Sequence, residues 1–297
     1  MTVCLTGGTG FVGRNMVRRL VAEGHAVRAL ARNVPPEGFG HIQAARNKGS
    51  IQWVFGDVVS GAGLDDTMQG CDAVIHLVGI IVEKGTNTFE RVHHLGTRNV
   101  VEAARRAGIK RLVHMSALGV RADGVAAYQT SKWRGEEEVR KSGLPYCILR
   151  PSLIFARGDG FVRQMMDVMR KAPLFRPVPG NGKAKFRPIW VDDVTFCFAS
   201  ALTNAAATNQ TIELGGADEL TLDDVLAEIA RWAGVRKPAV HVPLPLMMAG
   251  ALLAQVLPNP PVTVDQLRML REGSTCDIAP MTRIFGFQPK GFKAAAT

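Results

Sequence analysis

Tyr128 and Lys132 are the residues of this sequence whose types and spacing best suit acid–base chemistry. They stand four positions apart in Tyr-Gln-Thr-Ser-Lys, so on a helix both side chains would lie on one face. A phenol transfers protons poorly at neutral pH unless its anion is stabilised, which a nearby ammonium can do. The pair could then pass a proton to or from a substrate oxygen while a nicotinamide cofactor carries hydride. The spacing is common, and an amphipathic surface pair is the alternative interpretation.

A glycine-rich turn near the start of the chain offers a site for such a cofactor. The run Thr6-Gly7-Gly8-Thr9-Gly10-Phe11-Val12-Gly13 follows an apolar strand at 2–5 and opens a helical pattern. Gly7 permits the tight turn, Gly10 lets the backbone approach a pyrophosphate, and Gly13 lets the helix pack against the sheet. The new helix also directs free N–H groups and its positive dipole end at the phosphates. Strand, turn, helix and second strand in this order predict a dinucleotide site.

The end of the second predicted strand indicates which dinucleotide binds. The residues there are Ala29-Leu30-Ala31-Arg32-Asn33, without the acidic residue that an NAD site usually places on the ribose. A small residue followed by an arginine suits the 2′-phosphate of NADP, and Arg14 beside the glycine turn could assist. Either arginine could instead be merely solvated. We expect NADP(H) in preference to NAD(H).

Further cofactor contacts are expected where later strands end. Asp57 suits a hydrogen bond to adenine, with an ordinary turn aspartate as the alternative, and the small Gly79 would let the nucleotide lie against the backbone. We expect no metal site, because the histidines and cysteines do not cluster with other ligands. The complete predicted cofactor-binding set is Gly7, Gly10, Phe11, Val12, Gly13, Arg14, Arg32, Asp57, Val58, Val78, Gly79, Tyr128, Lys132 and Pro151.

Apolar runs that alternate with helical patterns predict an α/β fold. The predicted strands lie at 2–5, 26–31, 51–55, 73–78, 111–115 and 146–149, and a helical run covers 89–107. This alternation implies right-handed crossovers and a Rossmann-type doubly wound parallel sheet. We expect residues 1–155 to form an NADP(H)-binding domain to which 188–199 return. Residues 156–187 and 200–297 would form a smaller C-terminal region for the substrate or a partner.

Composition restricts the class of protein further. The five scattered cysteines include no C-x-x-C pair, which favours free thiols in a reducing compartment. No leader pattern precedes the first predicted strand, so we expect a cytoplasmic protein, with a position peripheral to the inner membrane as an alternative. We expect no transmembrane segment, because the apolar stretch 242–257 is too short to span a bilayer. A core or interface helix is favoured there over a membrane-surface helix.

The formal net charge of +10 favours anionic partners in general. No nucleic-acid-binding motif is visible, so we expect no nucleic acid partner. Residues 157–187 hold eight Lys/Arg against two acids. One interpretation of this segment is a solvated basic face. The other is a binding surface for a phosphate, for an acidic membrane surface or for an acidic protein partner of a membrane-associated complex.

Taken together, the motifs resemble those of the extended or atypical short-chain dehydrogenase/reductase family. A closer resemblance is to bacterial relatives of the NADPH-binding accessory subunit of respiratory complex I, alpha-subcomplex subunit nine. The first resemblance is carried by T-G-G-T-G-F-V-G at 6–13, G-D at 56–57, H-L-V-G at 76–79, G-T-R-N-V at 96–100, Y-x-x-S-K at 128–132, L-R-P-S-x-I-F at 149–155 and W-V-D-D-V at 190–194. The second combines L-R-P-S-x-I-F-x-R-x-D-x-F at 149–161 with V-P-L-P at 242–245, P-P-V-T-x-D-Q-L-x-x-L at 260–270 and F-G-F-Q-P at 285–289.

The short-chain family implies a serine or threonine that binds the substrate carbonyl together with Tyr128 and Lys132. Ser116 is the candidate in His114-Met115-Ser116-Ala117-Leu118. Many members carry two consecutive serines, of which the second is catalytic, and in that register Ala117 occupies the catalytic position and Ser116 is structural. Losing one donor to a developing oxyanion costs ~10²–10³ in rate.

Three functions follow from these patterns. The first is an NADP(H)-dependent oxidoreductase that uses Tyr128, Lys132 and Ser116 on a small-molecule substrate that the sequence does not identify. The second is a non-catalytic NADPH-binding accessory or assembly protein of a respiratory complex I or quinone-related complex. The third is a nucleotide-sugar epimerase or dehydratase, which the missing acidic ribose ligand disfavours because such enzymes commonly retain NAD.

Overall fold

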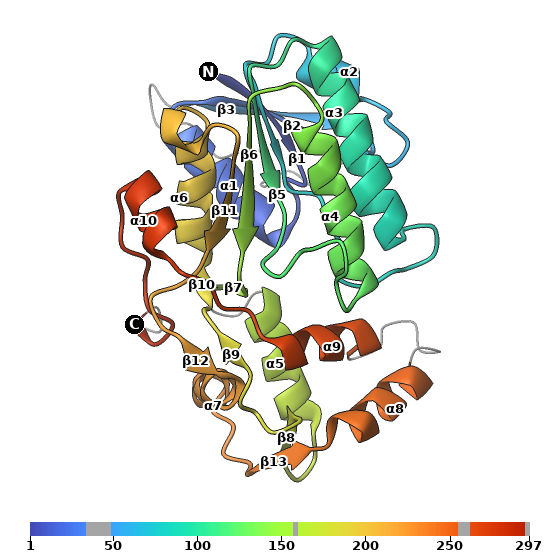
Figure 1. The fold of residues 1–297 in the computed structure, drawn as a ribbon, viewed down its shortest axis with the longest axis vertical. Helices are drawn as coiled ribbons and strands as arrows, with labels where there is room; N and C mark the ends of the chain where they lie inside the picture. The colour runs from blue at the N-terminus through green and yellow to red at the C-terminus, as the bar shows by residue number, and fades with distance from the viewer. Residues whose placement is uncertain (34–48, 157–159, 255–261, 295–297) are drawn as a thin grey trace.

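Seven parallel strands form the central sheet of the computed structural model, which describes residues 1–33, 49–156, 160–254 and 262–294 (Figure 1). Their order across the sheet is β11-β6-β5-β4-β1-β2-β3, which is the doubly wound order predicted for a Rossmann-type sheet. The predicted fold class is therefore confirmed. The strands are β1 (Thr2–Thr6), β2 (Ala26–Ala31), β3 (Ser50–Phe55), β4 (Ala73–His76), β5 (Arg111–Met115), β6 (Tyr146–Pro151) and β11 (Gln210–Leu214).

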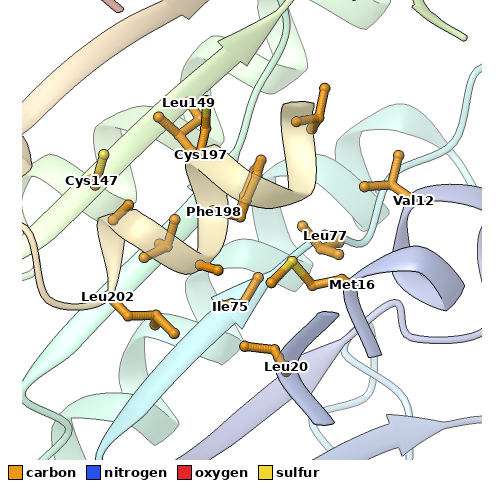
Figure 2. Close-up of a cluster of buried hydrophobic side chains, with 14 of the residues drawn as sticks. Val12, Met16, Leu20, Ile75, Leu77, Cys147, Leu149, Cys197, Phe198 and Leu202 are labelled. Carbon is orange, nitrogen blue, oxygen red and sulfur yellow. The ribbon is translucent and has the colours of Figure 1, made fainter. Parts of the chain in front are cut away.

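Helices cover both faces of this sheet, so its inner strands are apolar on both sides. Val3 and Leu5 of β1 face one helical layer, whereas Cys4 between them faces the other. The first layer holds α1 (Phe11–Ala22), α6 (Val191–Ala201) and α10 (Ala279–Phe285), and the second holds α2 (Leu64–Met68), α3 (Gly96–Arg106) and α4 (Ala127–Arg140). Figure 2 shows Met16 and Leu20 of α1 packed with Phe198 of α6 over the sheet.

The predicted helical run 89–107 is formed by two consecutive segments. A π-helical stretch, η1 (Glu90–Leu95), leads directly into α3. π-Helical turns place one extra residue in a helix and occur frequently at functional sites. Here the turn carries His93, which lies beside Tyr128.

A smaller lobe lies below the carboxyl ends of the strands in Figure 1. Its own core includes Phe155, Val225 and Phe292, all fully buried. The lobe contains β7 (Ile154–Ala156), α5 (Gly160–Lys171), β8 (Arg176–Pro179), β9 (Lys185–Phe186), β10 (Ile189–Trp190), β12 (Leu220–Thr221), α7 (Leu222–Trp232), β13 (Ala239–Val242), α8 (Leu244–Ala254) and α9 (Val264–Glu272).

Two pieces of the region expected at 200–297 belong to the larger lobe instead. Strand β11 pairs in parallel with β6, with Ile212 opposite Leu149, and becomes the seventh strand of the sheet. Helix α10 packs beside it through Met281 and Phe285, which join the same core as α1 and α6. The expected division is wrong at these two pieces, because β11 completes the sheet edge and α10 covers it.

The apolar stretch expected at 242–257 contains α8, which packs against α9 but is not a core helix. Only Ala251 of α8 is buried, and residues 255–257 lie outside the described residues. No helix among the described residues combines the length and apolar character needed to cross a membrane.

Candidate functional site

A cavity of about 500 Å³ lies at the carboxyl edge of the sheet, between the two lobes. It is bounded by the glycine turn after β1, the ends of β4, β5 and β6, the start of α4, and residues of α5 and α9. Ligand sites of doubly wound sheets occur at this edge, where the strand order reverses. Ten of the predicted site residues line it: Gly7, Gly10, Phe11, Val12, Gly13, Gly79, Ser116, Tyr128, Lys132 and Pro151.

The glycine turn has the geometry that the sequence predicts. Gly7 has φ +82, in the left-handed region that favours glycine, and a Cβ on Gly13 would lie 2.0 Å from the Gly7 carbonyl oxygen. A Cβ on Gly10, in contrast, would meet only that oxygen, at 3.4 Å. The protein itself therefore leaves room for a side chain at Gly10. No side chain caps the first N–H groups of α1, and Phe11, Val12 and Gly13 face the cavity. This cradle fits a dinucleotide pyrophosphate.

The other five predicted cofactor-binding residues lie outside the cavity lining. Arg32 is exposed one residue beyond the end of β2, and Arg14 lies on the first turn of α1. Asp57 accepts a 2.7 Å hydrogen bond from the Val59 N–H, which gives it the turn role that was its alternative. The side chain of Val58 is buried in the core, and Val78 is partly buried against it.

Tyr128 and Lys132 lie on one face of α4, as predicted, and both line the cavity. The Lys132 ammonium donates a 2.7 Å hydrogen bond to the Met115 carbonyl oxygen. Burial lowers the pKa of Lys132 to about 8, although the charge of Glu136 acts in the opposite direction. Burial also raises the pKa of Tyr128 to about 12. The chain alone therefore keeps this phenol protonated, and the expected lowering of its pKa by Lys132 is not found.

His93 is a neighbour of Tyr128 that the sequence did not point to. Its Nε2 accepts a 3.0 Å hydrogen bond from the Ile80 N–H, so the ring proton lies on Nδ1. Nδ1–H then donates to the Ser131 hydroxyl at 2.9 Å, and that hydroxyl donates to the Tyr128 carbonyl oxygen at 3.0 Å. Burial, together with the charge of Lys132, lowers the pKa of His93 to about 2. A neutral histidine thus fixes the first turn of α4.

Ser116 lies beside the cavity, but its hydroxyl oxygen is buried away from solvent. That oxygen has no hydrogen-bond partner among the described residues. Nearby, the fully buried Glu136 receives two hydrogen bonds of 2.7 and 2.8 Å from Arg150. Burial acts to raise the pKa of Glu136, but the hydrogen bonds and charge of Arg150 lower it. Ala117, the next residue, also lines the cavity. The register in which Ser116 is structural and Ala117 occupies the carbonyl-binding position therefore stays a prediction.

The rest of the cavity lining is mainly apolar, although Gln164, Gln266 and Glu272 also belong to it. The apolar residues of the described lining include Ile80, Met115, Leu118, Phe161, Met165 and Met269. Lys132 is the one cation among the described residues that line the cavity. The sequence did not place α5 and α9 at the site, because both reach it from distant positions along the chain.

Helix α9 is attached to α4 by a polar contact. The Gln129 amide donates to Glu272 at 2.7 Å and to the Gly119 carbonyl oxygen at 3.1 Å. Arg121 also pairs with Glu272. Gln129 follows Tyr128 directly, so this contact fixes α9 over the residue that carries the phenol.

Comparison with known proteins identifies the family. Residues 7–168 match a protein family described as NAD(P)H-binding. The chain belongs to this NAD(P)H-binding family. The matched range contains the glycine turn, Gly79, Tyr128 and Lys132. A pyridine dinucleotide therefore agrees with both the cradle at Gly10 and the family.

This NAD(P)H-binding protein is 29% identical to ceramide reductase from Caulobacter vibrioides (strain NA1000 / CB15N), over 84% of this chain and 77% of the relative. It is 27% identical to NADH dehydrogenase (ubiquinone) 1 alpha subcomplex subunit 9, mitochondrial, from Arabidopsis thaliana, over 89% of this chain and 68% of that protein. The structure of MoeE5 in complex with UDP-glucuronic acid and NAD matches with a TM-score of 0.75 and 21% identity, over 100% of this chain and 96% of that chain. The relatives confirm the resemblance drawn from the motifs, and the solved structure confirms the fold.

Proposed function

We propose that this protein is an NADP(H)-dependent oxidoreductase that interconverts a carbonyl and a hydroxyl group in an apolar substrate. The observation that carries the proposal is that Tyr128, Lys132 and the uncapped start of α1 meet at one cavity. A bound nicotinamide supplies or accepts hydride. Tyr128 exchanges the proton with the substrate oxygen, and Lys132 holds the nicotinamide ribose.

The state of Tyr128 suits the reductive direction. Because burial keeps its pKa at about 12, the phenol is protonated at neutral pH and can donate to a carbonyl oxygen as hydride reaches the carbon. His93 and Ser131 hold the backbone of Tyr128 in place through their hydrogen bonds. The Tyr128 phenol is therefore a proton donor held in a fixed position beside the proposed cofactor site.

NADP(H) is the proposed cofactor because of the end of β2. Arg32 is exposed there and can pair with a 2′-phosphate, whereas no acidic residue stands between Ala26 and Asn33 to bind the two ribose hydroxyls. Arg14, on the first turn of the adjacent α1, is a second candidate for that phosphate. An acidic residue would instead repel it.

The apolar lining supports an apolar substrate over a nucleotide sugar. The pyrophosphate of a nucleotide sugar calls for cations, commonly arginine pairs. Lys132, the cation of the described lining, is already engaged with the Met115 carbonyl oxygen. The similarity to a ceramide reductase, a relative named for a lipid substrate, supports the same choice.

The test is turnover of NADPH against a panel of apolar ketones, quinones and nucleotide sugars. We expect an apolar ketone or quinone to be reduced, and Tyr128→Phe to lower kcat by ~10²–10⁴ because the proton donor is lost. Tyr128→Phe should still be stabilised thermally by NADPH. Thermal stabilisation by NADPH without turnover of any compound would argue against the enzyme.

A non-catalytic NADPH-binding accessory protein is the second candidate, and one observation favours it. Ala117 occupies the position where the family resemblance expects a carbonyl-binding hydroxyl, while the Ser116 hydroxyl oxygen is closed off from solvent. The similarity to a complex I subunit supports the same role. In that case NADPH would stabilise the fold and Tyr128→Phe would change nothing measurable.

A further inference from the structure

Helix α8 is apolar on all sides and yet exposed. Its eleven residues, LPLMMAGALLA, include no charged or polar side chain, and only Ala251 is buried. Leu246, Leu252 and Leu253 are 64%, 61% and 77% exposed. A helix that is apolar all round is ordinarily enclosed by protein or lipid.

Other exposed apolar side chains lie at the same end of the smaller lobe. The loop after α5 carries Leu174, which is 77% exposed, and the exposed Phe175. Strand β8 follows that loop and pairs in parallel with β13, which carries the exposed Val240 and leads into α8. These segments share the lower end of the lobe in Figure 1. We define the apolar tip as Leu174, Phe175, Val240, Leu246, Leu252 and Leu253.

Cations without nearby acids accompany the apolar tip. Residues 168–187 and 233–254 contain no Asp or Glu. Among the described residues, no carboxylate forms an ion pair with Arg170, Lys171, Arg176 or Arg236. Lys237 donates to the carbonyl oxygens of Met169, Arg170 and Ala172, which ties the start of β13 to the end of α5. These hydrogen bonds hold the basic residues at the end of α5 and before β13 beside the apolar tip.

Three acids lie on elements next to this region: Asp223, Asp167 and Asp265, of which Asp265 on α9 is 3.5 Å from Arg268. Asp223 is engaged with His241 at 2.9 Å, and Asp167 is exposed about one turn before Arg170 on α5. They leave an excess of positive charge around an apolar surface. That combination matches the interface of a bilayer with anionic headgroups.

We propose that the apolar tip inserts into the surface of an anionic lipid bilayer. At about 1.5 Å per residue, α8 is ~16 Å long and can lie in the interface but cannot span a ~30 Å hydrocarbon core. A second copy of the chain fits less well, because a two-fold contact would place the cations of one tip against those of the other. Anionic headgroups bring the opposite charge instead.

Docking would place the cavity close to the bilayer. Helix α8 packs against α9, and Gln266, Met269 and Leu270 of α9 line the cavity. An apolar substrate could then pass from lipid to Tyr128 without crossing water. This last step rests on the proposed function, whereas docking itself does not.

Vesicle flotation of the full chain tests the docking. We expect binding to vesicles of phosphatidylcholine mixed with phosphatidylglycerol, weak binding to phosphatidylcholine alone, and a loss of affinity as salt is raised. Leu253→Glu should weaken binding about tenfold. Phe55→Glu, a matched control at the end of β3 that is 69% exposed, should bind as the parent does. The double variant Arg170→Glu and Lys171→Glu should also weaken binding about tenfold.

Thermal stabilisation by NADPH confirms that each variant is folded, since the substituted side chains are exposed. Absence of binding to anionic vesicles, equal binding to both vesicle types, or full binding by Leu253→Glu would overturn the proposal. So would a concentration-dependent dimer that Leu253→Glu dissolves, because the tip would then bind a second copy. None of these outcomes depends on turnover, so docking and the proposed reaction can fail separately.

Discussion

The rings of His93 and Tyr128 meet edge to face, with centroids 5.2 Å apart and planes at 87°. His93 belongs to a group of three buried histidines around Lys132, the others being His76 and His114. His76 is held between Thr6 and Thr97 by hydrogen bonds of 2.6 and 3.1 Å. The site is therefore built on imidazoles that are neutral in the folded protein.

Stability should fall as the pH drops below about 6.5. Burial lowers the pKa of His76 to about 3 and contributes most to lowering that of His93 to about 2, and it holds the pKa of His114 well below its usual range. The unfolded chain binds protons on these histidines below about pH 6.5, whereas the folded chain does not. Each of the three histidines should lower the free energy of unfolding by about 1.4 kcal/mol for every pH unit below about pH 6.5. Urea unfolding between about pH 7 and pH 5 measures this slope.

His114→Leu removes one buried titratable ring. The free energy of unfolding should therefore fall less steeply with pH, by about 1.4 kcal/mol per pH unit. An unchanged slope in His114→Leu would show that the ring is already protonated in the folded chain.

Gly10→Ala and Gly13→Ala should separate cofactor binding from folding. A Cβ at Gly10 meets only the Gly7 oxygen at 3.4 Å, so that variant should fold normally but lose most of its thermal stabilisation by NADPH. A Cβ at Gly13 would lie 2.0 Å from the same oxygen, so that variant should lose stability even without cofactor. Thermal unfolding with and without NADPH tests both. Full stabilisation of Gly10→Ala by NADPH would contradict the pyrophosphate cradle.

Arg32→Ala should raise the Kd for NADPH about tenfold and leave the Kd for NADH nearly unchanged, because it removes a charged partner of the 2′-phosphate. Arg18→Ala is the matched control, since Arg18 is also exposed and lies on the neighbouring α1. Titration calorimetry with both dinucleotides gives the two constants. Equal losses for NADH and NADPH in Arg32→Ala would refute a contact with the 2′-phosphate.

Ala117→Ser should raise kcat/KM for an apolar ketone by about tenfold or more, because it adds a hydroxyl donor at the cavity wall. Ser116→Ala should leave both turnover and stability unchanged, because the buried Ser116 hydroxyl oxygen has no hydrogen bond among the described residues to lose. Steady-state kinetics and urea unfolding of both variants provide the measurements. The opposite pattern, with turnover lost in Ser116→Ala and no gain in Ala117→Ser, would make Ser116 the carbonyl ligand.

Local sequence patterns predicted the parts of the site that are formed by residues close together along the chain. The turn at Gly7–Gly13 and the strands β1 to β6 follow from apolar runs and glycine spacing, which act over a few residues. Strand β11 was missed because Gln210–Leu214 alternates in burial at the sheet edge and is joined to β6 only by tertiary pairing. The spacing of apolar residues does not indicate which distant strand β11 pairs with.

The orientation of single side chains and helices within the fold could not be predicted from the sequence either. Whether the hydroxyl of Ser116, directly after β5, reaches the cavity or is enclosed depends on how β5 sits against α4, and local spacing does not encode that arrangement. The same holds for α8, whose composition alone suits a core helix. Its exposure follows from where the smaller lobe ends, which the apolar pattern does not encode.

The late strand β11 also determines how the molecule must fold. The chain leaves the sheet after β6, builds β7 to β10 of the smaller lobe, returns for α6 and β11, leaves again, and returns once more for α10. Contacts such as Arg19 with Thr195 therefore join residues that are 176 positions apart. Many contacts of this range mean a high contact order and slow folding. A polypeptide ending before residue 210 would lack the edge strand of its own sheet, so the larger lobe is assembled from separate segments of the chain.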